Sequence, residues 1–214
     1  IKELCGRPLI AYTVDAAIEA RKRLGGHILL STDDAETAGI VRGLGIEVEY
    51  MRPAELAGDT SGSREVMLHA MDWAESQGIE YDCVVLLQPT SPFRTADDIV
   101  ACTQLLEPGI DMAVSVCEAA DNPYFNIFET DADGYLHISK GDGKLTRRQD
   151  APKAWVYNGA VYAINPASLR AMPMGMFGHR VPSVMPRERS IDIDGPADWL
   201  AAETIMSRQT LIKR

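Results

Sequence analysis

The sequence has few cysteines, no long apolar run and no excess of positive charge. Its four cysteines lack the paired spacing of a metal site and suit a reducing compartment. No apolar stretch approaches the roughly 20 residues that a membrane span needs. The first residues also lack the basic segment followed by an apolar run that is typical of a secretory signal. We therefore expect a cytoplasmic protein that does not enter a membrane.

The charge balance excludes further classes of partner. Asp and Glu number 31 against 21 Lys and Arg, so the formal net charge is -10. Neither nucleic acid nor an anionic membrane attracts such a surface, and we expect no nucleic-acid partner. The four histidines show no spacing suited to a metal site or to a Ser-His-Asp hydrolase. A chain of 214 residues that is 46% hydrophobic is long and apolar enough for one packed domain.

Apolar periodicity alternates between helix and strand along most of the chain. The spacing predicts helices over residues 8–24, 34–44, 64–77 and 95–106, and a last helix that opens at Gly195-Pro196. Strands are expected at residues 28–31, 47–51, 84–87, 112–117 and 160–164. Repeated βα units of this kind predict an α/β fold with a doubly wound, mostly parallel sheet.

Residues 121–153 interrupt this rhythm. Two short strands are expected there, at residues 124–129 and 134–138, on either side of a turn. The segment concentrates large apolar side chains, which a monomer rarely leaves exposed. We therefore expect residues 1–120 and 154–214 to form one α/β domain and residues 121–153 to form an inserted arm that needs a partner.

The run from Val84 to Arg94 leads from an apolar strand directly into a polar turn. Two prolines end the strand, and Thr95 is expected to cap the following helix. Gln88 would then lie at the carboxyl edge of the sheet, where open α/β folds bind their ligands. From the residues alone, an ordinary strand, turn and capped helix explains the run equally well.

Two further motifs carry side chains suited to an anionic ligand. The loop from Arg52 to Ser63 is rich in small and hydroxylated residues, so it can bind phosphate or ribose, or it can simply be a solvated loop. In Asp192-Ile193-Asp194, a strand would bring both carboxylates to one face about 6 to 7 Å apart. Such a pair can hold Mg²⁺ together with substrate phosphates, although two solvated aspartates give the same pattern.

These motifs, taken together and in this order, resemble the acylneuraminate cytidylyltransferases, the CMP-sialic acid synthetases. The matching segments span essentially the whole chain: Arg52 to Ser63, Leu86-Leu87-Gln88-Pro89-Thr90-Ser91-Pro92-Phe93-Arg94, Arg148-Gln149-Asp150-Ala151-Pro152 with Asn158-Gly159-Ala160-Val161-Tyr162, and Ser190 to Asp198. The resemblance implies a nucleotide-diphospho-sugar transferase-like fold. It also implies that the arm forms a homodimer and that a first strand with a basic phosphate loop precedes Ile1.

The resemblance also implies a role for each candidate site residue. Arg52 and Ser63 would contact the nucleotide, and Asp192 and Asp194 would be catalytic and hold Mg²⁺ (or Mn²⁺). The sugar would be bound by a third set of residues: Gln88, Arg148, Asn158 and Tyr162. The implied reaction joins CTP to a nine-carbon 2-keto sugar acid and releases pyrophosphate.

Two other functions fit parts of the sequence. A glycosyltransferase with an Asp-x-Asp motif would use Asp192 and Asp194 to hold a nucleotide sugar and consume it, but the Gln88 run and the Arg52 loop argue against this. A non-catalytic nucleotide-binding protein is the other alternative. The sequence does not determine which acid is used among N-acetylneuraminate, its deaminated analogue KDN, legionaminate and pseudaminate.

Overall fold

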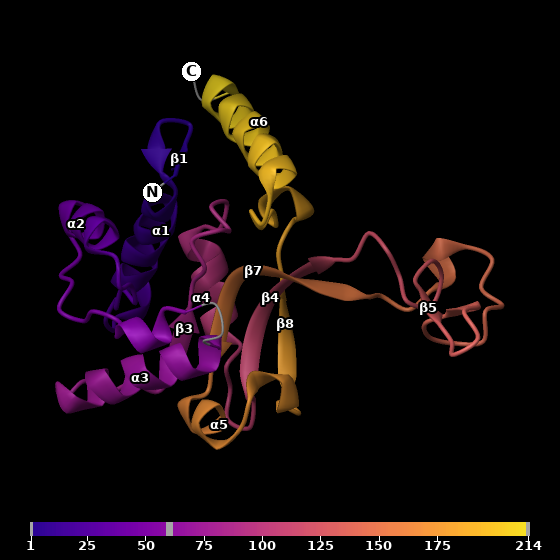
Figure 1. Cartoon of the computed structure of the whole chain (residues 1–214), viewed down its shortest axis with the longest axis horizontal. Helices are drawn as coiled ribbons and strands as arrows, with labels where there is room; N and C mark the ends of the chain where they lie inside the picture. Colours follow the sequence, from indigo (N-terminus) through magenta and orange to yellow (C-terminus); the bar gives the residue numbers. More distant parts are fainter. Residues whose placement is uncertain (1, 59–61, 213–214) are drawn as a thin grey trace.

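The computed structural model describes residues 2–58 and 62–212, and Figure 1 shows its central sheet. The sheet has the strand order β3 (Val84–Leu86), β7 (Trp155–Ile164), β4 (Met112–Glu118), β8 (Arg180–Val184). Strands β3 and β4 are each antiparallel to β7, and β8 is parallel to β4. The α/β fold with a central sheet is therefore confirmed, and three of its four strands run in one direction. Because β7 is reversed between β3 and β4, two of the three ladders are antiparallel, and the described sheet is mixed and not mostly parallel.

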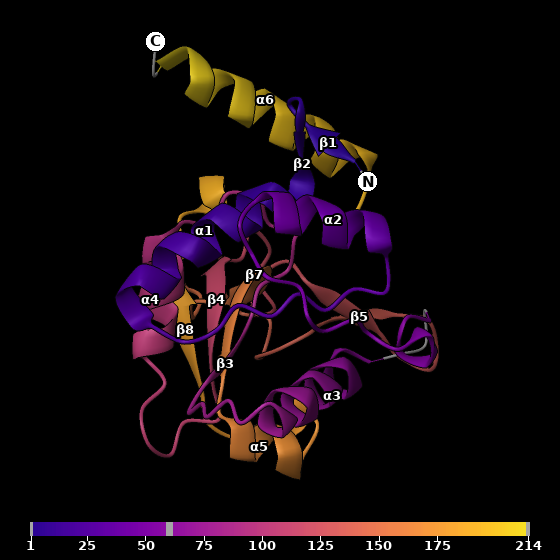
Figure 2. The same ribbon diagram turned by 90° about the vertical axis from the view of Figure 1, so that its left-hand side faces the viewer.

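Helices cover both faces of this sheet (Figure 2). On one face, α1 (Leu9–Leu24) and α4 (Ala96–Gln104) pack their alanines, valine and isoleucine on β4 and β7. On the other, the methionines of α3 (Ser63–Ser76) pack with α5 (Pro166–Ala171) against the opposite side chains of β4. Because successive residues of β4 face opposite sides, one strand supplies both cores, as a doubly wound fold requires.

Capping side chains determine where two helices begin. The Thr95 side chain accepts from the backbone N–H of Asp98, and the Asp98 carboxylate accepts from the Thr95 N–H, so α4 begins with a complete capping box. The predicted cap at Thr95 is thus confirmed. Asp34 caps α2 (Ala35–Gly43) by accepting from the backbone N–H groups of Glu36 and Thr37.

The strands expected at residues 28–31 and 47–51 are absent from the described sheet, and those two predictions are wrong. A strand needs a ladder of hydrogen bonds to a neighbour. Here the backbone bond between the two segments runs from Arg52 N to Thr32 O at 2.8 Å, beyond both expected strands. Ile28 and Leu30 are partly buried, because they pack against the cluster that contains the buried Val14 of α1.

Several short elements complete the fold. Strands β1 (Glu3–Leu4) and β2 (Arg7–Pro8) pair as a small hairpin, and α6 (Pro196–Ile212) lies beside it (Figure 1). Single-turn 3₁₀ helices stand at η1 (Ala54–Leu56), η2 (Arg148–Asp150), η3 (Met174–Met176) and η4 (Arg187–Arg189). Among the described helices, none is long and apolar enough to cross a membrane.

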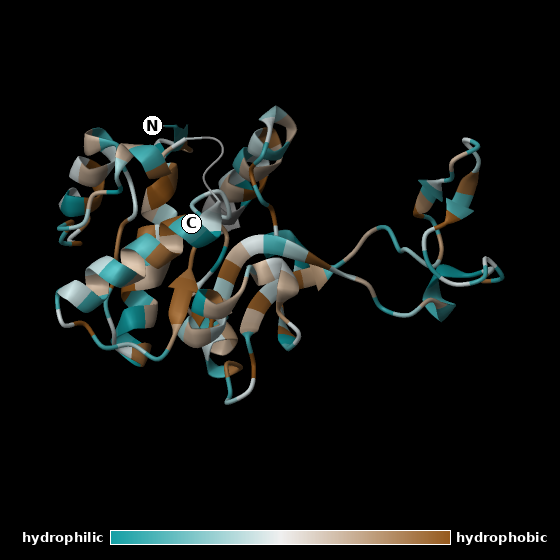
Figure 3. Cartoon of the chain, turned by 60° about the horizontal axis from the view of Figure 1, so that its bottom comes forward, coloured by the Kyte–Doolittle hydropathy of each residue, from teal (hydrophilic) through white to brown (hydrophobic). Residues whose placement is uncertain are grey.

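Residues 121–153 form an arm that projects away from the sheet (Figure 1). Its strands β5 (Phe128–Thr130) and β6 (Leu136–Ile138) pair antiparallel, shorter than the expected strands. Figure 3 shows apolar stretches on this hairpin, and two of its large side chains are mostly exposed, Tyr135 at 69% and Leu136 at 67%. The arm therefore presents a surface that a solvated hairpin does not need.

Candidate active site

The candidate site lies where three segments meet: the turn after β3, the middle of β7 and residues 190–194. The backbone N–H of Ile193 donates to Thr90 O at 2.9 Å, which fixes residues 190–194 against the turn. Ile191 and Ile193 are partly buried and pack in the cluster that contains Phe93. The predicted strand at Asp192-Ile193-Asp194 is wrong, because its neighbour is a turn and a turn provides no ladder of bonds.

A wide bulge in β7 shapes the floor of the site. Val114 pairs with Tyr162 and Val116 with Tyr157, so the single residue Ser115 faces residues 158–161. The buried Ser115 hydroxyl fills the bulge with two hydrogen bonds. It accepts from the backbone N–H of Val161 at 2.7 Å and donates to Asn158 Oδ1 at 2.6 Å. Bulges of this kind often lie next to active sites, where they change the direction of a side chain.

Gly159, inside this bulge, brings two oxygens from distant segments together. A Cβ at this position would lie 2.8 Å from both Asp192 Cγ and Gln88 Oε1, closer than real Cβ contacts allow. Its φ of +69° also lies in the left-handed region that favours glycine. The glycine thus allows the Gln88 amide and the Asp192 carboxylate to converge above one backbone position.

Asn158 is part of the protein interior. Its side chain is 2% exposed, and its Nδ2 donates to Ser190 Oγ at 2.9 Å while its Oδ1 accepts from Ser115. Because both polar atoms have protein partners, Asn158 holds the start of residues 190–194 onto β7. The direct contact between Asn158 and sugar hydroxyls, expected from the sequence, stays a prediction.

Arg94 is a buried residue of the site that the sequence reasoning missed. It is 4% exposed, donates to Thr13 Oγ1 at 2.6 Å and donates to the carbonyl oxygen of Gln88. Burial lowers the pKa of its guanidinium to about 10, against the opposing effect of the Asp192 and Asp98 carboxylates. The signal available in the sequence was an arginine directly after a buried strand and turn, where burial requires hydrogen-bond partners.

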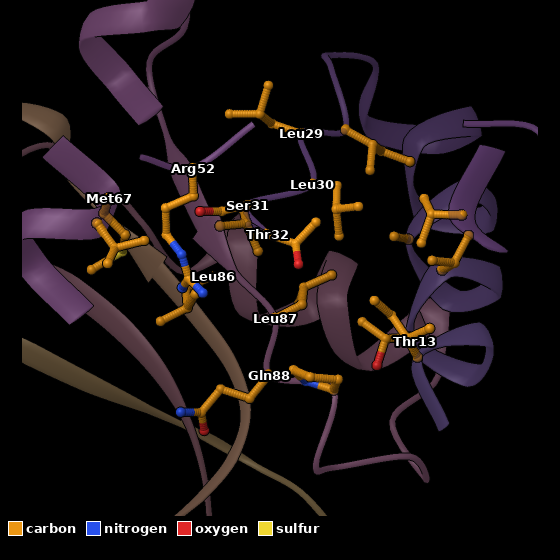
Figure 4. A pocket seen from close by; sticks show the side chains of 18 of the residues that line it. Thr13, Leu29, Leu30, Ser31, Thr32, Arg52, Met67, Leu86, Leu87 and Gln88 are labelled. Carbon is orange, nitrogen blue, oxygen red and sulfur yellow. The ribbon is translucent and has the colours of Figure 1, made fainter. Parts of the chain in front are cut away.

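A cavity of about 580 Å³ brings Arg52, Ser63 and Gln88 to one space. Figure 4 shows Arg52 reaching past Ser31 toward Leu86, with Gln88 at the other end of the cavity. Arg52 Nη2 donates to Asp33 Oδ1 at 2.6 Å, and this bond lowers the pKa of Asp33. Of the Arg52 loop, residues 59–61 lie outside the described residues.

The buried Nε of Arg52 has no hydrogen-bond partner within residues 2–58 and 62–212. Because its Nη2 is occupied by Asp33 while Nε is not, the guanidinium is fixed in direction yet retains donor capacity. A fork of this kind suits an anion such as phosphate. Ser63 is exposed as the first residue of α3, and Gly62 is the N-cap residue of that helix.

The remaining two sugar candidates lie in different places. Tyr162 is half-buried on β7, where burial first and the nearby Asp192 carboxylate second raise its pKa. Its ring meets that of Tyr157 edge to face, with centroids 6.1 Å apart. Arg148 is exposed in the arm and lines a separate hollow of about 420 Å³, so a single chain does not bring it into the cavity of Gln88.

Asp192 and Asp194 are carboxylates of the kind that a hard cation takes together with substrate oxygens. Within the part of the chain that the structure describes, no group of three or more His, Cys, Asp or Glu side chains is placed to hold a metal. The two carboxylates alone are within the number that Mg²⁺ commonly takes, since it binds one or two together with phosphate oxygens and water. Asp198 accepts from the backbone N–H groups of Asp194 and Gly195 at 3.2 and 2.9 Å, which holds the turn that carries Asp194.

Comparison with known proteins gives several relatives that match nearly the whole of this chain. The flagellin modification protein B of Campylobacter coli is 29% identical over 99% of this chain and 89% of its own length. The CMP-N,N'-diacetyllegionaminic acid synthase of Legionella pneumophila is 28% identical over 95% of this chain and 87% of its own length. The N-acylneuraminate cytidylyltransferase of Escherichia coli is 27% identical over 96% of this chain, which spans only 48% of that protein.

Solved structures show the same fold at lower identity. A CMP:2-keto-3-deoxy-manno-octonic acid synthetase complexed with CTP superposes with a TM-score of 0.66 at 15% identity, over 97% of this chain and 91% of its own. A 4-diphosphocytidyl-2C-methyl-D-erythritol synthase from Anaerococcus prevotii also gives 0.66, at 11% identity, over 96% and 92%. The family model of the cytidylyltransferases matches residues 1–153. This chain therefore belongs to the cytidylyltransferase family, and it is a nucleotidyltransferase.

Proposed function

We propose that this enzyme transfers CMP from CTP to a nonulosonic acid, an acidic nine-carbon 2-keto sugar of the sialic or legionaminic type. The observation that carries the proposal is the meeting of Gln88 and Asp192 over Gly159, at one end of a cavity that contains Arg52 at the other. The names of the relatives support the same pair of substrates.

The residues around the cavity have different roles in the reaction. The Arg52 guanidinium, held by Asp33, binds CTP phosphate, and the Ser63 hydroxyl binds the nucleotide nearby. Gln88 orients the sugar acid so that its anomeric hydroxyl faces the α-phosphorus. The hydroxyl oxygen forms the new bond to phosphorus as the bond to pyrophosphate breaks, and positioning supplies most of the rate.

We propose Asp192 and Asp194 as the ligands of the catalytic Mg²⁺ (or Mn²⁺). When bound, the cation neutralises charge on the phosphates as the leaving group departs. The exposed Asp194 carboxylate also accepts the proton that the sugar hydroxyl releases. Asp192 accepts a hydrogen bond from the buried Ser91 hydroxyl, and this bond holds the two carboxylates at a fixed distance from β7.

A homodimer completes the sugar pocket in this proposal. The arm carries Arg148, and its exposed apolar hairpin supports a contact with a second copy. In the dimer, Arg148 pairs with the sugar carboxylate and Tyr162 lines the sugar side of the site, while the buried Asn158 holds residues 190–194 beside it. The four cysteines are free thiols, which supports the proposed cytoplasmic location.

A substrate panel tests the proposal directly. The full-length protein is incubated with CTP, Mg²⁺ and, in turn, N-acetylneuraminate, KDN, N,N'-diacetyllegionaminate or pseudaminate, and products are identified by mass spectrometry. We expect a CMP ester with at least one acid of this panel. A glycosyltransferase would instead consume an added CMP-sugar and transfer its sugar, and a non-catalytic protein would bind CTP without forming product, so either result rejects the proposal.

The cavity predicts a selective loss on changing Arg52. We expect Arg52→Met to raise the KM for CTP at least about tenfold, because it removes a charge-assisted hydrogen bond of the order of 1.5 to 3 kcal/mol. The KM for the sugar acid should change less than twofold. Arg42→Met, which removes an exposed arginine bound to a backbone carbonyl of Val48, is the matched control. Equal losses for both substrates would place Arg52 outside the nucleotide site.

A further inference from the structure

The Ser91 hydroxyl connects the two halves of the candidate site. Ser91 is 1% exposed, and its Oγ lies 3.1 Å from the carbonyl oxygen of Asn158 and 3.2 Å from Asp192 Oδ1. A hydroxyl has one hydrogen, so Ser91 shares it between these two acceptors. The turn after β3 is thereby joined to the bulge of β7 and to the carboxylate at once.

The two oxygens of Asp192 are therefore constrained from different directions. Oδ1 receives the Ser91 hydrogen bond, and Oδ2 lies over Gly159, where a Cβ would collide with it. The backbone on both sides is fixed as well, by the bond from Ile193 N to Thr90 O and by the amide of Asn158 on Ser190. A carboxylate held in this way has little rotamer freedom left to lose when substrate binds.

We propose that Ser91 and Gly159 are positioning residues for Asp192. Ser91 directs the carboxylate by its hydrogen bond, and Gly159 provides the space in which Asp192 and Gln88 approach each other. Neither residue contacts the reacting atoms, so each acts through Asp192. The inference deepens the proposed cytidylyl transfer and rests on it for its kinetic part.

The kinetic test is a double-mutant cycle on the full-length protein. We expect Ser91→Ala to lower kcat about tenfold, the usual effect of one hydrogen bond to a charged group. In the Asp192→Asn background, the same change should cost less than twofold, because residues that act through one another are not additive. If Ser91 had only a structural role, Ser91→Ala would lower kcat by the same factor in both backgrounds, and that result would overturn the proposal.

Ser183→Ala is the matched control for this cycle. Ser183 is a buried serine of β8, and no bond connects it to Asp192 among the hydrogen bonds of the described residues. We expect less than a twofold effect on kcat from this change. A loss equal to that of Ser91→Ala would show that any buried serine in this sheet has the same effect, and would remove the special role of Ser91.

Gly159 is tested by a pair of glycine substitutions. We expect Gly159→Ala to lower kcat between about ten- and 100-fold, since displacing a catalytic group by about 1 Å has effects of this size. Gly45→Ala is the control, because Gly45 has a similar φ of +88° but nothing lies within 4 Å of its added Cβ. Strain alone would affect the two variants alike, whereas the proposal requires the loss in kcat to be specific to Gly159.

A crystal structure of Ser91→Ala gives a readout that is independent of activity. We expect the Asp192 carboxylate to rotate away from its place over Gly159, while residues 190–194 keep their backbone path. An unchanged Asp192 rotamer would overturn the positioning role. Failure of the unmodified protein to make a CMP-sugar would reject the proposed function instead, and the rotamer of Asp192 would still decide the role of Ser91.

Discussion

Asp194→Asn is expected to lower turnover at least about 100-fold while the protein remains folded. The change keeps the size of the side chain but removes the charge that binds the cation and accepts the proton. Losing one electrostatic contribution to a transition state typically costs about 10²- to 10³-fold in kcat. Because Asp194 is exposed and its carboxylate contributes little to packing, the thermal midpoint should shift by no more than a degree or two.

Two companion variants make this result specific. Asp192→Asn should lower turnover less than Asp194→Asn does, because Asp192 is proposed only as a metal ligand, whereas Asp194 also accepts the proton. Asp97→Asn serves as the control, since Asp97 is 85% exposed on α4 and pairs only with Arg23 within the described ion pairs. Turnover of Asp194→Asn within a few-fold of the unmodified protein would contradict the assignment.

The Phe128→Asp and Leu136→Asp double variant is expected to convert a dimer into a monomer. Both side chains are more than half exposed on the arm hairpin, and burying a charge in their place costs several kcal/mol. Light scattering should give close to half the mass of the unmodified protein. The KM for the sugar acid should rise at least about tenfold, because Arg148 would no longer reach the second subunit, while CTP affinity should remain within twofold.

Lys144→Asp is the control for this variant. Lys144 is 85% exposed in the same arm, so the change introduces a negative charge without removing apolar surface. It should leave the mass unchanged. A monomer measured for the unmodified full-length protein would contradict the proposed dimer, and a dimeric double variant would place the interface elsewhere.

The helices and central strands of this fold were predictable because their signals are local. The spacing of apolar residues predicted the bounds of α1 and α4 to within one or two residues, and the capping residue Thr95 showed where α4 begins. Strands depend on a partner that the sequence does not name, which is why residues 28–31 and 47–51 were wrongly predicted. The helix α5 and the strand β8 are among the elements that were not predicted, and β8 gives a weak strand signal because it is a short edge strand that carries a proline.

In the site, too, features that depend on neighbouring residues could be predicted from the sequence, and features that depend on distant residues could not. Its functional motifs could be found from the sequence, because Gln88 and Asp192 stand in recognisable runs of residues. The role of Gly159 could not be derived, since an Asn-Gly pair ordinarily indicates a turn and here belongs to a bulge inside a strand. Arg94 was missed because arginine is rarely buried, so its place directly after a buried strand and turn was not read as a sign of burial.

The most direct test of cytidylyl transfer is the stoichiometry of pyrophosphate release. The full-length protein is supplied with CTP, Mg²⁺ and the acid that the substrate panel identifies, with UTP and ATP in parallel reactions. The account predicts one pyrophosphate for each CMP-sugar formed, with CTP, and none when the acid is omitted. Pyrophosphate release without the acid, or formation of a CMP-sugar without pyrophosphate, would contradict it.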